Sequence, residues 1–127
     1  MTPSELTPSM LAFLSERHLA SLTTLRADGS PHVVPVGFSF DATENLVRII
    51  TFDNCTKVRN ARRGGRAAVS QVDGGRWLTL EGTISATSDP DRVATAVNAY
   101  ASRYQEPKVR PDRVAIEIII DRVMGNA

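Results

Sequence analysis

A turn signal between two apolar segments constrains the fold of this chain more than any other feature. Residues 19–25 are rich in β-branched and apolar side chains, and they stop just before Asp28-Gly29. After that pair, residues 32–40 read HVVPVGFSF, and every second position is apolar: Val34, Val36, Phe38 and Phe40. This alternation is typical of a strand with one buried face, and Asp-Gly between two such segments indicates a tight β-hairpin.

The remainder of the chain continues as short strands and short helices. Further strands are predicted at residues 46–52, 67–72, 76–86 and 114–123. Helices are predicted at residues 9–16, from Thr56 to Gly64-Gly65, and from Ser88-Asp89-Pro90 onward. We therefore expect a mainly β protein, a six-stranded antiparallel barrel with three short helices at its ends, folded as one domain over residues 1–127.

Composition excludes several classes of protein. The chain carries 15 Lys and Arg against 14 Asp and Glu, with a pI near 8.0, which argues against a dedicated nucleic-acid binder. A single cysteine, Cys55, leaves no internal disulfide and no multi-cysteine metal site. His18 and His32 have no acidic partner at ligand spacing, so no metal is expected. No apolar run approaches the roughly 20 residues of a membrane span, and the N-terminus has no signal-peptide pattern. The expected location is the cytoplasm.

The basic residues are concentrated in one helix. Five cations fall within ten residues that contain no acid: Lys57, Arg59, Arg62, Arg63 and Arg66. A local excess in a nearly neutral protein indicates a bound anion. Lys57 lies in the first turn, where a cation opposes the helix dipole, and Asn60 follows on the same face. With Thr56 as cap, this helix start is a candidate phosphate site, whereas Arg62 is expected only to be solvated.

The second strand carries a second clue, because it contains Pro35 and Gly37. Proline has no N–H for the strand ladder, so its presence predicts an edge or a split in the barrel. Glycine leaves the same face flat, so another group can lie against the backbone. A flat surface near an anion site is suited to a planar cofactor with a phosphate tail, although both residues are also ordinary at a sheet edge.

The order of these elements resembles a known family. The VVPVGF strand, the TKVRN helix start and the VDGGRWLTLEG hairpin are similar to the split β-barrel oxidoreductases related to pyridoxamine 5′-phosphate oxidase, the FMN-binding split barrels. FLSERHLASLTTLRADGSPHVVPVGFSFD and SQVDGGRWLTLEG resemble its actinobacterial F420-binding branch, and within it the F420-dependent biliverdin reductases. The resemblance covers nearly the whole chain, and it implies a homodimer with two cofactor sites at the interface.

The resemblance also assigns candidate cofactor-binding residues. Those expected along the deazaflavin ring and ribityl chain are Pro35, Val36, Gly37, Ile50 and Thr51. Those expected at the phosphate are Thr56, Lys57 and Asn60, with Arg59 and Arg63 at the glutamate tail. Those expected from the partner subunit are Gln71, Arg76 and Trp77. Trp77 favours an interface independently, because it lies on the polar face of its strand and aromatic residues are enriched at interfaces.

The implied function is hydride transfer from reduced F420 to a small conjugated acceptor, with biliverdin as the best candidate. No catalytic acid is identifiable, which fits chemistry that the cofactor performs while the protein orients it. Two alternatives remain open: an FMN-dependent oxidoreductase with the same fold, and a carrier of flavin or haem without enzymatic activity. Binding to nucleic acid or to a membrane is not expected.

Overall fold

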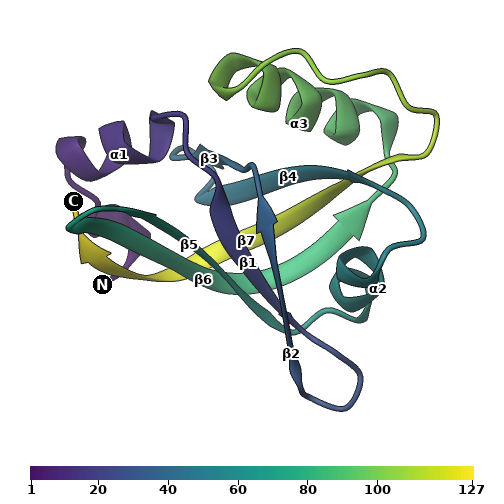
Figure 1. The fold of residues 1–127 in the computed structure, drawn as a ribbon, viewed down its shortest axis with the longest axis horizontal. Coiled ribbons are helices and arrows are strands. Elements are labelled where there is room, and N and C mark those ends of the chain that lie inside the picture. The colour runs from purple at the N-terminus through teal and green to yellow at the C-terminus, as the bar shows by residue number, and fades with distance from the viewer.

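The computed structural model describes residues 1–127, and its strands form one curved antiparallel sheet (Figure 1). The strands are β1 (Ala20–Leu25), β2 (Pro31–Val36), β3 (Ser39–Asp41), β4 (Leu46–Phe52), β5 (Arg66–Asp73), β6 (Arg76–Thr87) and β7 (Arg113–Asn126). Their order is β2-β1-β5-β6-β7-β4-β3. The expected class, a mainly β antiparallel sheet with three α-helices, is confirmed.

The strand count differs from the prediction because residues 32–40 do not form one strand. The chain leaves β2 after Val36 and re-enters the sheet as β3 at Ser39. These two strands are the opposite edges of the sheet, so the barrel is split where Gly37 and Phe38 cross it. The Phe38 amide donates to the Tyr104 hydroxyl and its carbonyl accepts from Arg103, in place of a neighbouring strand. Seven strands therefore replace the expected six.

Three α-helices cover the ends of the barrel. They are α1 (Pro8–Ser15), α2 (Thr56–Arg63) and α3 (Pro90–Arg103), after a short 3-10 turn at Pro3–Glu5. Thr7 and Asp89 cap α1 and α3 through side-chain oxygens, and Gly64, with φ of 80°, ends α2. In Figure 1, α3 lies over β3 and β4, whereas α2 lies at the other end of the sheet. No helix has the length and apolar character that a membrane crossing requires.

The apolar core lies inside the curved sheet. On β6, Leu78, Leu80 and Ile84 are buried while Trp77 points outward, as the alternation predicts. The long strand β7 pairs with β6 along one side and with β4 along the other, so it joins the two halves of the barrel. Its outward-facing Glu117 is also buried, because α3 covers it and Arg92 pairs with it. This ion pair thus joins the start of α3 to the outer face of β7.

A bulge in the β6–β7 ladder supplies a stability test. A Cβ on Gly82 would lie 1.8 Å from the backbone oxygen of Ile119, so the two strands would have to separate. We expect Gly82→Ala to lower the free energy of unfolding by about 1–3 kcal/mol or more, measured by urea denaturation. Gly75→Ala is the matched control, because nothing lies within 4 Å of its Cβ position. Equal stability of the two variants would contradict the observed pairing at the bulge.

Candidate functional site

A cavity of about 340 Å³ opens at the split, between the ends of β2 and β4. Six of the residues expected at the cofactor line it: Pro35, Val36, Gly37, Ile50, Thr51 and Lys57. Pro35–Gly37 lie at the end of the edge strand β2, and Ile50 and Thr51 lie near the end of β4, the strand beside the other edge. The fold thus brings the ends of β2 and β4 and the start of α2 around one space, although they are separate in the sequence.

The wall of this cavity carries an excess of positive charge. Lys57 makes no ion pair or hydrogen bond, and its ammonium lies 5.6 Å from the centroid of the Phe52 ring. The Arg110 guanidinium lies 4.3 Å from the same centroid and pairs with Asp112 at 2.9 Å. Arg113 donates to a backbone carbonyl and has no carboxylate partner. Two of the three cations therefore remain uncompensated by protein carboxylates, and an anion is a suitable ligand.

The face of Gly37 is occupied differently from the prediction. A Cβ there would lie 3.0 Å from Tyr100 and 3.1 Å from Tyr104, so the group that packs against this glycine is a tyrosine pair from the end of α3. The two rings are 4.9 Å apart at 32°. The Tyr104 hydroxyl donates to the carbonyl of His18 at 2.6 Å, and burial raises its pKa. Gly37 makes room for aromatic side chains of its own chain.

The start of α2 also departs from the prediction. Cys55 is the N-cap and makes no side-chain cap hydrogen bond, while Thr56 is already helical, so the expected Thr56 cap is wrong. The Thr56 hydroxyl accepts instead from Arg59. Asn60 is only 4% exposed, and its amide donates to the Thr24 hydroxyl at 2.9 Å. This position contradicts the expectation that Asn60 shares a phosphate with Lys57.

The arginines of the basic helix point elsewhere. Arg62 pairs with Asp53 at 2.8 Å on an exposed surface, in agreement with its expected solvation. Arg63 donates to the carbonyl of Leu25 and to Asn60, and so fastens α2 to the end of β1. Arg59 is exposed and bonds only Thr56. Among the cations of this helix, Lys57 alone lines the cavity.

The three residues assigned to the partner subunit lie in different environments. Gln71 is fully buried, donates to the carbonyl of Phe13 and accepts from Arg103, which contradicts a contact with a cofactor bound to another subunit. Arg76 lies over the Phe13 ring and is engaged in ion pairs. Trp77 is 40% exposed on the outer face of β6 and makes no side-chain hydrogen bond, so it is open to a neighbour, whereas the partly exposed Arg76 side chain is already held by Glu16 and Asp73.

An ion-pair cluster joins the end of α1 to the β5–β6 hairpin. Arg76 bonds Glu16 at 2.7 Å and Asp73 at 2.6 Å, and His18 lies 3.1 Å from Glu16. Potential ligand atoms of Glu16, His18 and Asp73 all lie within 4.8 Å of one another, an arrangement that the sequence did not predict because Asp73 comes from a distant strand. The Arg76 guanidinium already bonds both carboxylates.

Sequence reasoning missed several groups at the split. Tyr100, Pro107, Arg110 and Arg113 reach the cavity from α3 and the segment after it, far from the basic helix. The Nδ1 atom of His32 is buried without a hydrogen-bond partner, which nothing in the sequence indicated. Burial lowers the His32 pKa, with Arg26 and Lys57 adding to the effect. The one sequence signal for these groups is the four-residue spacing of Tyr100 and Tyr104, and this spacing is equally typical of a helix face that packs in a core.

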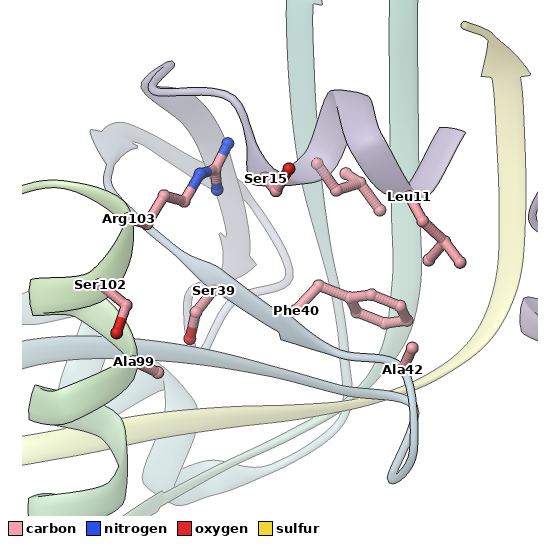
Figure 2. A pocket seen from close by; sticks show the side chains of 9 residues that line it. Leu11, Ser15, Ser39, Phe40, Ala42, Ala99, Ser102 and Arg103 are labelled. Atoms are coloured by element: carbon pink, nitrogen blue, oxygen red, sulfur yellow. The ribbon is translucent and has the colours of Figure 1, made fainter. Parts of the chain in front are cut away.

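A larger cavity of about 410 Å³ lies between α1, β3 and α3 (Figure 2). Leu11 and Phe40 face one another across it, and Ser39, Ala99 and Ser102 form its other side (Figure 2). No residue expected at the cofactor lines it. Its one cation, Arg103, is already bonded to the carbonyls of Glu16 and Phe38, so this space lacks a free charge for an anionic ligand.

Comparison with known proteins gives a consistent picture. The family model described as pyridoxamine 5′-phosphate oxidase matches residues 6–126. An F420H2-dependent biliverdin reductase from Mycobacterium tuberculosis is 55% identical over 126 residues, covering 99% of this chain and 92% of that protein. A solved F420 reductase is 25% identical with a TM-score of 0.72, covering 89% and 94% of the two chains. A putative pyridoxamine 5′-phosphate oxidase from Listeria innocua shares the fold, with a TM-score of 0.74 at 19% identity over 92% and 94%.

The Glu16–Arg76 pair predicts a pH dependence of stability. The Arg76 and His18 hydrogen bonds lower the pKa of Glu16 from 4.5 to about 2. A carboxyl with a lowered folded-state pKa stabilises the fold above its unfolded pKa, and this contribution disappears as the pH falls through the folded value. We expect Glu16→Gln to flatten the loss of stability between pH 4.5 and about 2. Thermal unfolding as a function of pH measures this effect, and it is done at low salt because salt weakens an exposed ion pair. The same loss of stability at acid pH in the variant and the wild type would contradict the prediction.

Proposed function

The chain belongs to the pyridoxamine 5′-phosphate oxidase family, and on that basis we propose that it is an oxidoreductase that uses reduced F420 as hydride donor. The observation that carries this proposal is the 55% identity, over 99% of the chain, to an F420H2-dependent biliverdin reductase. The relationship supports biliverdin, or a closely related conjugated tetrapyrrole, as the acceptor. The proposal is F420-dependent reduction of such an acceptor.

The residues at the split fit a planar cofactor with an anionic tail. The backbone of Pro35–Gly37 and the side chains of Ile50 and Thr51 would lie along the ring and ribityl chain, and Lys57 would hold the phosphate. Arg110 and Arg113 add positive charge for the phosphate or the glutamate tail. When bound, reduced F420 supplies the hydride. The side chains of this protein bind and orient the two reactants, and the cavity offers no carboxylate to oppose the anion.

The family name favours a second candidate, an FMN-dependent oxidoreductase with the same cavity. F420 and FMN both present a planar ring and a phosphate, so a cation at the start of α2 serves either. A non-enzymatic carrier of flavin or haem is a third possibility for this fold. Titration of the purified protein with F420 and with FMN, side by side, distinguishes the first two candidates by affinity.

The same experiment separates an enzyme from a carrier. Protein that binds F420 tightly and FMN weakly, and that oxidises F420H2 when biliverdin is added, would support the proposal. Preferential FMN binding would favour the oxidase branch. Tight binding of either cofactor without turnover against a panel of conjugated acceptors would favour a carrier, as would a haem Soret band in the purified protein.

We further propose that the protein is a homodimer formed through the outer face of β5, β6 and β7. Val72 and Trp77 pair directly across β5 and β6, and Met124 lies opposite Thr79 on β7. All three apolar side chains are exposed. On the same face, one carboxylate oxygen of Glu81 is buried without a hydrogen-bond partner. A second copy on this face would cover the apolar residues and supply groups for that carboxylate.

Lys57 provides the sharpest test of the cofactor site. A hydrogen bond to a charged group contributes about 1.5–3 kcal/mol, so Lys57→Ala should weaken F420 binding about ten- to a hundredfold. Arg62→Ala is the matched control on the same helix, because Arg62 pairs with Asp53 away from the cavity. Both titrations are run at one ionic strength. Equal losses would indicate a diffuse basic surface in place of a defined phosphate contact.

The dimer predicts a mass of twice 13.8 kDa by light scattering at micromolar concentration. Trp77→Lys should shift the protein toward monomer, because it places a charge in the apolar centre of the proposed interface. Val109→Lys is the control, since Val109 is fully exposed in the segment after α3. A monomeric wild-type protein would refute the dimer, and a Trp77→Lys variant that remains dimeric would refute this face.

A further inference from the structure

Tyr100 differs from its neighbour Tyr104 in one respect that matters for ligand binding. The Tyr104 hydroxyl is fixed by the backbone of His18 and Phe38, whereas the Tyr100 hydroxyl makes no hydrogen bond within the protein. Its ring is nevertheless held in place, because it stacks on Tyr104 and packs against Gly37. The fold therefore presents an oriented phenol whose polar end has no partner.

Tyr100 also separates two cavities. It lines the cavity of the proposed cofactor site, and it lines a second space of about 310 Å³ beside Arg17, His18 and Leu19. A ligand too large for the first cavity would therefore extend past this ring. Biliverdin is such a ligand if it shares the site with a deazaflavin ring.

The donors around the cofactor cavity are of two kinds. The cations Lys57 and Arg110 flank Phe52 at the end of β4, where they suit phosphate or carboxylate groups. The Thr51 hydroxyl is buried beside Cys55. Tyr100, which belongs to α3 and packs against Gly37 just after β2, is the neutral side-chain donor with a free hydroxyl. A neutral O–H group suits a carbonyl oxygen or an imine nitrogen, the heteroatoms of a conjugated acceptor.

We propose that the Tyr100 hydroxyl binds the acceptor by donating a hydrogen bond to one of its carbonyl oxygens or ring nitrogens, at the rim between the two cavities. This inference deepens the proposed function and rests on it. The Tyr104 ring and Gly37 position Tyr100, and the cations Lys57 and Arg110 that line the same cavity hold the cofactor anion. Cofactor and acceptor are thereby recognised by separate groups of this chain.

The test measures equilibrium binding with oxidised F420, which forms no product. Biliverdin is titrated into the protein with F420 bound and followed by its absorbance, and F420 binding alone is followed by fluorescence. Loss of one neutral hydrogen bond should weaken biliverdin binding about two- to tenfold in Tyr100→Phe, with F420 affinity unchanged. Tyr104→Phe is the matched substitution, because it should instead lower the melting temperature by a few degrees.

The outcomes separate this inference from the proposed function. Wild-type biliverdin affinity in Tyr100→Phe would overturn the assignment of Tyr100 and leave F420 dependence intact. An equal loss of F420 and biliverdin binding would make Tyr100 part of the cofactor wall and would also overturn the assignment. A wild-type protein that binds F420 without biliverdin would overturn both the acceptor and Tyr100's role, whereas failure to bind F420 would overturn the proposed function itself.

Discussion

The hydrogen bonds to the backbone of Phe38 are the interaction on which the rest of the structure depends. At this residue the chain passes from one edge of the sheet to the other, so no strand is available to satisfy its N–H and C=O groups. Leaving either group buried and unpaired would cost about 1–3 kcal/mol. Tyr104 accepts from the amide and Arg103 donates to the carbonyl, both from the end of α3. The split is stable because side chains at the end of α3 make the hydrogen bonds that a neighbouring strand would otherwise make.

The position of α3 follows from the same contacts. Arg103 also donates to the carbonyl of Glu16 and to the buried amide of Gln71, so one guanidinium joins α3 to α1, to β5 and to the split. Burial lowers the Arg103 pKa, yet a planar guanidinium stays charged and presents several donors in fixed directions, which suits three acceptors from three elements. At the other end of the helix, Arg92 pairs with the buried Glu117. Both ends of α3 are therefore fixed, and the segment that follows it lines the cavity through Pro107 and Arg110.

Sequence reasoning succeeded where the determinants are local. Alternation predicted the strands, Gly64-Gly65 predicted the end of α2, and Pro35 with Gly37 located the split. It failed where a residue's environment is set by distant elements. Asn60 shares a helix face with Lys57 in projection, but β1 covers that face and buries the amide against Thr24. Tyr100 and Tyr104 are four residues apart and so share one helix face, but nothing in the sequence indicates that this face covers Gly37.

The charge distribution of α2 explains why a cluster of cations yields one candidate contact. Asp53 pairs with Arg62, Asp121 pairs with Arg66 at the start of β5, and Arg63 bonds a backbone carbonyl. Most of the local positive charge is therefore engaged in contacts within the protein. Lys57 and Arg59 have no acidic partner, and of these two only Lys57 lines the cavity. In the first helical turn its charge opposes the dipole, a cost of about 0.3–1 kcal/mol for an exposed side chain, and no acid of this chain offsets it. A position that is unfavourable in the free protein becomes favourable once an anion lies at the helix start. This reversal is the physical reason to place the phosphate there.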